Sequence, residues 1–209
     1  MNAAIRSVVR SSIYYGLAPY GVYRGYQGLL EGDIVTMGAR SVSRILALGG
    51  TILKSSRSED FRSKEGRAKA YEELKKNEID GLVVIGGDGS FTGAEVFTQE
   101  YDIPTIGIPG TIDNDLYGTD YTIGYDTASN VITDCIDKIR DTATSHNRLF
   151  FVEVMGRDSG FLALRSGIAT GAIAVMLPEE KRSISDLISI LETGAANQKT
   201  SSIVIVAEG

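Results

Sequence analysis

The sequence contains one cysteine, one histidine and no long hydrophobic run. The single cysteine, Cys135, excludes a disulfide within the chain, and its spacing from Ile132 and Ile139 predicts a core position on a helix. The only histidine, His146, is interpreted as a surface or loop residue and not as a catalyst. No stretch approaches the roughly 20 apolar residues of a membrane span, so we expect a cytoplasmic protein without a membrane partner.

Basic residues are fewer than acidic ones, 21 against 27, so the formal net charge is −6 and the isoelectric point is near 4.9. Proteins that bind nucleic acid concentrate Lys and Arg on a strongly basic face, so nucleic acid is not expected as a partner. An anionic substrate would have to meet positive charge locally, and the candidates are Arg57, Arg148 and Arg157. From the residues alone, Arg57 and Arg148 are better interpreted as solvated surface arginines.

Helical and strand patterns alternate along the chain, which is typical of a parallel sheet with right-handed crossovers. This predicts an α/β fold, a three-layer α/β/α parallel-sheet sandwich, with ligands beyond the carboxyl ends of the strands. The serine-rich, charged stretch 55–65 is expected to be a mobile loop. Helices are expected at 3–15, 41–47, 63–77, 89–99, 127–144, 160–170 and 183–197, and strands near 18–23, 81–85, 105–108, 149–154, 172–177 and 202–207.

Two turns rich in glycine and aspartate follow short apolar segments, which we interpret as strands buried on both faces. The first turn, 86–90, reads Gly-Gly-Asp-Gly-Ser, and its glycines let backbone N–H groups approach an anion at the next helix start. The second, 109–115, reads Pro-Gly-Thr-Ile-Asp-Asn-Asp. Asp88 could hold a magnesium ion, and the closely spaced Asp113 and Asp115 fit one base and one group beside the metal. Either turn alone could be an ordinary Asx-turn, but the two together favour a phosphoryl-transfer site.

These residues resemble the bacterial ATP-dependent 6-phosphofructokinases over essentially the whole chain. The two turns carry the resemblance, together with Met-Asn-Ala-Ala-Ile-Arg at 1–6, Gly-Gly-Thr at 49–51, Gly-Tyr-Asp-Thr-Ala at 124–128, Val-Met-Gly-Arg at 154–157 and Glu208. The resemblance implies the phosphofructokinase fold with two similar domains, an ATP-binding one at 1–124 and a sugar-phosphate one at 125–209, both partial. It also implies an internal fragment, because a Gly-Gly-Asp-Ala-Pro-Gly turn that precedes Met1 in the family and a segment beyond Glu208 are absent.

The implied reaction is transfer of the γ-phosphoryl group of ATP to the 1-hydroxyl of fructose 6-phosphate, the committed step of glycolysis, with Mg²⁺ as cofactor. By position in the family motifs, Asp113 is the base, Arg157 neutralises the transferring phosphoryl group, and Thr111 donates a hydrogen bond beside it. Asp88 and Asp115 lie on the magnesium side. The sugar is contacted by Thr111, Asp113, Asp115, Met155, Gly156, Arg157 and Glu208, and the nucleotide by Arg57, Asp88, Gly89, Ser90 and Gly93.

The resemblance also implies a homotetramer, because the counterpart of Arg148 holds the sugar 6-phosphate in a neighbouring subunit's site. An allosteric effector site is indicated by Arg6, Arg10, Arg140 and Lys199. Its other family positions are occupied by Ala39, Ile173 and Asn197, which leaves effector identity and regulation open. Pyrophosphate-dependent relatives carry an aspartate and a lysine where this chain has Gly89 and Gly110, so the two small residues favour ATP as donor.

Three alternatives stay open at this point. One is a pyrophosphate-dependent phosphofructokinase, and another is a kinase of the NAD or lipid type that shares only the turn at 86–90. The third is a binding or regulatory subunit without turnover, which the intact Asp113 disfavours. Residues 1–209 by themselves are expected to be inactive, because the absent turn would supply backbone donors to the ATP phosphates.

Overall fold

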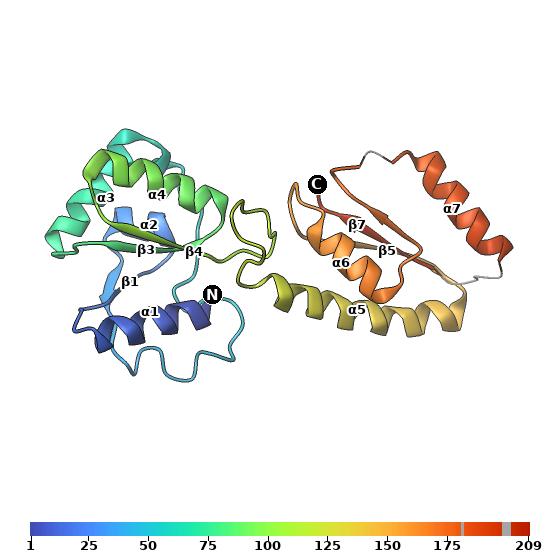
Figure 1. The fold of residues 1–209 in the computed structure, drawn as a ribbon, viewed down its shortest axis with the longest axis horizontal. Helices are drawn as coiled ribbons and strands as arrows, with labels where there is room; N and C mark the ends of the chain where they lie inside the picture. The colour runs from blue at the N-terminus through green and yellow to red at the C-terminus, as the bar shows by residue number, and fades with distance from the viewer. Residues whose placement is uncertain (181, 198–201) are drawn as a thin grey trace. The chain divides into compact units, whose positions relative to one another are not determined.

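The computed structural model describes residues 1–180, 182–197 and 202–209. The chain forms two compact units, Met1–Gly110 and Thr111–Gly209 (Figure 1). Each unit combines helices with parallel strands, which confirms the expected α/β class. The division between the units falls earlier than the domain boundary after Gly124 that the resemblance implies. The residues following Gly110 join the second unit because Thr111 and Asp113 accept hydrogen bonds from side chains of that unit.

In the first unit, two short strands form an antiparallel pair and two longer strands a parallel pair. Its elements are α1 (Asn2–Tyr14), β1 (Tyr20–Val22), α2 (Gly25–Glu31), β2 (Ile34–Thr36), η1 (Asp60–Arg62), α3 (Lys64–Lys76), β3 (Leu82–Gly86), α4 (Asp88–Tyr101) and β4 (Thr105–Pro109). In the parallel pair, Leu82 lies opposite Thr105 and Gly86 opposite Pro109. The carboxyl ends of β3 and β4 are therefore level with each other, and both glycine-rich turns leave the sheet at that edge.

In the second unit, the described strands form one parallel sheet in the order β5-β7-β6. Its elements are α5 (Tyr125–His146), β5 (Leu149–Val154), α6 (Phe161–Thr170), β6 (Ala174–Met176), α7 (Ile184–Ala196) and β7 (Ser202–Ala207). Helix α7 begins with a capping box. The Ser183 hydroxyl accepts a hydrogen bond from the Asp186 N–H, and the Asp186 carboxylate accepts one from the Ser183 N–H. No described helix is both long enough and apolar enough to cross a bilayer.

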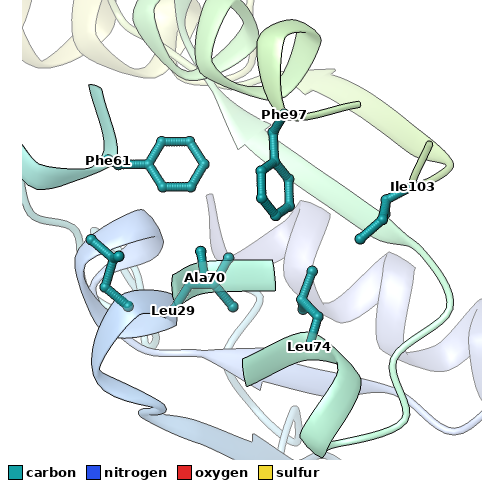
Figure 2. Packing of buried hydrophobic residues seen from close by; sticks show 7 residues of the cluster. Leu29, Phe61, Ala70, Leu74, Phe97 and Ile103 are labelled. Carbon is teal, nitrogen blue, oxygen red and sulfur yellow. The ribbon is translucent and has the colours of Figure 1, made fainter. Parts of the chain in front are cut away.

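The core of the first unit is a cluster in which α2, α3 and α4 meet. Figure 2 shows its side chains pointing toward one another: Leu29, Phe61, Ala70, Leu74, Phe97 and Ile103. The ring of Phe61 stacks on Tyr26 at a centroid distance of 3.9 Å and lies 5.4 Å from that of Phe97. The second unit has its own cluster, in which Ile136 of α5 and Ala163 of α6 pack on Ile203 and Ile205 of β7.

The boundaries of most elements follow the expected ones, but the region 20–54 differs. The helix expected at 41–47 is wrong, because this segment forms turns and Arg44 has a left-handed φ of 60° that interrupts helical geometry. Helix α2 and strand β2 were not expected. Strand β1 forms an antiparallel pair with β2, from which α2 separates it in the sequence, and does not join a parallel sheet. The stretch 55–65, expected to be a loop, also includes η1 and the first residues of α3.

The expectation that β3 and β4 are buried on both faces is wrong in the described structure. Val83 and Ile106 pair across the ladder, and they are 42% and 66% exposed. Ile85, on the same face, packs against the cluster that contains Ile5 and Val9 of α1. Helix α1 therefore covers only one end of this face.

The expected core position of Cys135 is also wrong, because its side chain is exposed. The buried residues of α5 include Ser129, Ile136 and Ala143, which follow one another at intervals of two helical turns. Cys135 precedes Ile136 by one residue, a rotation of about 100° around the helix axis, and so points toward solvent. His146 is exposed at the last residue of α5, as expected for a surface residue.

The packing in Figure 2 leads to a stability prediction for the first unit. Phe97 is fully buried, so Phe97→Ala is expected to lower the free energy of unfolding by about 3–5 kcal/mol, from lost apolar burial and the cavity left behind. Urea denaturation followed by circular dichroism measures this change. The control is Phe151→Ala, at an exposed position, with an expected change within about 0.5 kcal/mol. Equal effects of the two substitutions would contradict the assignment of Phe97 to the core.

Candidate active site

The turn after β3 is held in a fixed shape at the start of α4. Gly87 is the N-cap of the helix, and its carbonyl accepts hydrogen bonds from the N–H groups of Ser90 and Phe91. A Cβ on Gly86 would lie 2.5 Å from Ser90 Oγ, so only glycine fits there without a shift. Asp88 and Gly89 are exposed in the first helical turn, where backbone N–H groups and the helix dipole favour an anion.

Packing against Tyr26 of α2 also fixes the turn 86–90. The Tyr26 hydroxyl donates a hydrogen bond to the Ser90 carbonyl at 2.6 Å, and burial raises the pKa of Tyr26. A Cβ on Gly93 would lie 3.1 Å from the Tyr26 ring and 3.4 Å from that of Phe61. Gly93, a predicted nucleotide contact, therefore also has a packing role in the described structure. Arg57, another predicted nucleotide contact, is exposed in the segment before η1.

The loop 111–124 carries three of the predicted site residues and is closed by its own hydrogen bonds. The Thr122 hydroxyl donates to the Thr111 carbonyl at 2.8 Å, and Asn114 Oδ1 accepts from the Thr122 N–H at 2.8 Å. Asn114 has a φ of 54°, a left-handed conformation that Asn adopts more readily than most residues. The N–H of Asp113 donates to Thr111 Oγ1 at 3.2 Å. These bonds fix Thr111 and Asp113 relative to each other.

A second, tight turn follows β5 at 155–160. Gly156 has a φ of 143°, and a Cβ there would lie 2.5 Å from the Ser159 carbonyl oxygen. This geometry requires glycine. Arg157 has a φ of 51°, and its N–H donates to Glu208 Oε2 at 3.2 Å. Glu208, the residue directly after β7, therefore contacts this turn through its carboxylate.

The loop 111–124, the turn 155–160 and Glu208 bring four of the predicted residues together within the second unit. Arg157 Nε lies 3.9 Å from Asp113 Oδ2, while Thr111 and Glu208 contact Asp113 and Arg157 respectively. Asp113 is 9% exposed, whereas Arg157 is exposed. The arrangement places a nearly buried carboxylate beside a solvent-facing guanidinium, which is suited to accepting a proton next to an anionic group.

The environment of Asp113 raises the pKa of its carboxyl group above the ordinary value. Burial is the main cause, and the negative charges of Asp115 and Glu208 act in the same direction. The hydrogen bond with Thr111 and the charge of Arg157 oppose the shift. A carboxylate that is harder to keep ionised than usual is a stronger proton acceptor, as a general base requires.

The remaining predicted contacts lie at exposed positions. Asp115 and Met155 are exposed in the two segments just described, and Arg148 is exposed between α5 and β5. Asp88 belongs to the first unit and Asp115 to the second. Among the described residues, no group of three or more His, Cys, Asp or Glu side chains is gathered as a metal site.

Two of the predicted effector residues already donate hydrogen bonds within the protein. Arg6 Nη1 donates to the Val42 carbonyl at 2.5 Å, and Arg140 donates to the carbonyl of Thr170. Arg10 is exposed on α1. Lys199 lies outside the described residues.

Sequence analysis missed three residues that organise the site: Asn114, Thr122 and Ser159. Asn114 stands inside the motif 109–115 and could have been singled out as a candidate for left-handed backbone geometry. Thr122 binds Thr111 across 11 residues of the sequence, and Ser159 binds Asp113 across 46. No local pattern reveals such partners.

Comparison with known proteins identifies the family of this chain. The sequence profile of the phosphofructokinase family matches residues 1–209. A protein from Bacteroides thetaiotaomicron named ATP-dependent 6-phosphofructokinase 2 is 60% identical over 208 residues, and one from Cytophaga hutchinsonii named ATP-dependent 6-phosphofructokinase is 56% identical over 209 residues. Both alignments cover 100% of this chain, which spans 64% of the length of each relative.

A solved structure shows the same fold. The phosphofructokinase of Saccharomyces cerevisiae superposes with a TM-score of 0.93 and 40% sequence identity, covering 100% of this chain and 32% of the yeast chain. The family match over every residue confirms the resemblance that the motifs indicated. The chain belongs to the phosphofructokinase family.

Proposed function

We propose that the protein transfers the γ-phosphoryl group of ATP to the 1-hydroxyl of fructose 6-phosphate, giving fructose 1,6-bisphosphate and ADP. The observation that carries this proposal is the grouping of Asp113, Arg157, Thr111 and Glu208 in the second unit. The names and high identity of the bacterial relatives support ATP and a 6-phosphosugar as substrates.

In this reaction, Asp113 accepts the proton of the attacking hydroxyl group. Its low exposure limits the movement of the carboxylate, and the hydrogen bond from the Asp113 N–H to Thr111 Oγ1 fixes the backbone that carries it. Arg157 lies at the right distance to balance negative charge that develops beside Asp113, and its exposed side chain can reach a bound phosphoryl group. Glu208 accepts a hydrogen bond from a sugar hydroxyl, and Met155 and Gly156 lie beside the bound sugar.

The first unit supplies the nucleotide contacts in this proposal. The turn 86–90 offers backbone N–H groups at the start of α4 to the phosphates, and Ser90 and Gly89 lie on that turn. Arg57 adds positive charge, and Gly93 is the remaining predicted nucleotide contact. Gly89 faces open space, so the protein leaves room beside it for a ligand.

Mg²⁺ fits the donor chemistry of this family site. Asp88 and Asp115 are exposed carboxylates, the hard oxygen ligands that Mg²⁺ prefers, and each is a proposed ligand in its own unit. When bound, Mg²⁺ neutralises phosphate charge.

We also propose a cytoplasmic homotetramer under allosteric control. The exposed Arg148 is free to reach the sugar 6-phosphate of a neighbouring subunit, which makes the active site dependent on assembly. Arg6, Arg10, Arg140 and Lys199 are the proposed effector contacts.

The proton-acceptor role of Asp113 is tested in the full-length protein with Asp113→Ser. We expect kcat to fall by roughly 10²- to 10⁴-fold, because proton transfer in the transition state is lost, while the KM for fructose 6-phosphate changes little. A coupled assay of ADP release measures both constants. The control is Asp120→Ser, an exposed carboxylate in the same loop, which should keep near-wild-type turnover. Near-wild-type turnover of Asp113→Ser would remove Asp113 from this role.

The choice of ATP over pyrophosphate is tested by Gly89→Asp combined with Gly110→Lys. The added side chains should crowd the α-phosphate, so the KM for ATP is expected to rise at least about tenfold, a loss of roughly 1.4 kcal/mol of binding. Gly89 faces open space, whereas a side chain at Gly110 must displace Met1 Sδ, which would lie 2.8 Å from its Cβ.

Steady-state kinetics with ATP and with pyrophosphate compare the donors. The matched control is Gly38→Asp, another glycine that faces open space. If the double variant keeps its affinity for ATP, the two glycines do not select the donor.

A further inference from the structure

We propose that Ser159 is a positioning residue that holds the backbone of Asp113 in a fixed position relative to the turn that carries Arg157. The side chain of Ser159 is 7% exposed, and its hydroxyl donates a hydrogen bond of 2.9 Å to the Asp113 carbonyl. The bond joins residues 46 positions apart in the sequence. This inference rests on the proposed function of Asp113.

The turn from which Ser159 reaches Asp113 is itself fixed by hydrogen bonds. The Ser159 N–H donates to the Gly156 carbonyl at 3.0 Å, and the Gly160 N–H donates to Glu179 Oε1 at 2.7 Å. The N–H of Arg157 donates to Glu208 Oε2. A hydroxyl on so constrained a turn has a defined direction, so it can set the position of the group that it binds.

The position of the Asp113 backbone determines where its carboxylate lies relative to Arg157. The two side chains are 3.9 Å apart, a separation that a small shift of the loop would change. Without the Ser159 hydroxyl, the Asp113 carbonyl loses a buried hydrogen-bond partner and the loop gains freedom. Misplacement of a reacting group by about 1 Å can cost on the order of 10²-fold in rate. Removal of this hydroxyl should therefore affect turnover more than substrate binding.

Ser166 provides a matched control for the loss of a buried hydroxyl. It is 0% exposed, and its hydroxyl donates to the Leu162 carbonyl at 2.6 Å within α6. Ser159→Ala and Ser166→Ala remove the same atom from similarly buried sites, but only the first removes a bond to the loop of Asp113. A purely structural role for Ser159 predicts the same kinetic outcome for both.

The experiment compares both variants in the full-length protein. Ser159→Ala is expected to lower kcat by roughly 10- to 100-fold, with the KM values for both substrates changed less than about threefold. Ser166→Ala should leave kcat within about threefold of wild type. In an Asp113→Ser background, Ser159→Ala should cause less than about a twofold further loss, because the group that it positions is already gone.

Hydrogen–deuterium exchange of peptides covering 111–124 gives a readout that is independent of activity. Faster exchange in Ser159→Ala than in Ser166→Ala supports the positioning role, and equal exchange overturns it. If Ser159→Ala keeps wild-type kcat while Asp113→Ser is impaired, Ser159 has no positioning role and the proposed function stands. If the wild-type protein shows no phosphoryl transfer, the proposed function fails, and the exchange comparison alone decides whether Ser159 orders the loop.

Discussion

The site of the second unit depends on the hydrogen bonds that fix the loop of Asp113 and keep this residue nearly buried. Thr122 and Asn114 close the loop that carries it, and Ser159 binds its carbonyl from a distant turn. The same burial raises the pKa of the carboxyl group. Hydrogen bonds therefore limit the movement of the loop, while burial makes the carboxyl group a stronger proton acceptor.

In the first unit, aromatic packing has the corresponding role for the turn 86–90. Tyr26 stacks on Phe61 and donates its hydroxyl hydrogen to the Ser90 carbonyl, so the core cluster of Figure 2 is continuous with the turn. Gly93 lets the helix approach these rings closely. The backbone that would bind phosphate is thus supported by apolar contacts and by a hydrogen bond to a carbonyl, and neither occupies its N–H groups.

Much of the fold could be predicted from the sequence where local signals are strong. The long helices follow periodic apolar patterns, and the strands β3, β4, β5 and β7 follow short apolar runs. The region 20–54 could not be predicted in the same way, because Arg24, Arg44 and Lys54 take left-handed conformations that their residue types do not favour. The exposed position of Cys135 was missed because the direction of an apolar stripe depends on what the helix packs against.

The sequence by itself determined the chemistry available to this protein. The motifs at 86–90, 109–115 and 154–157 contain glycines that allow close backbone approach, carboxylates that can accept a proton and an arginine that can balance negative charge, and these properties are local. Tertiary structure alone decided that Asp113 is buried, that Arg157 lies 3.9 Å from it, and that Ser159 and Glu208 join the same group. The physical reason is that burial and hydrogen bonding between distant residues arise only when separate segments of the chain pack together.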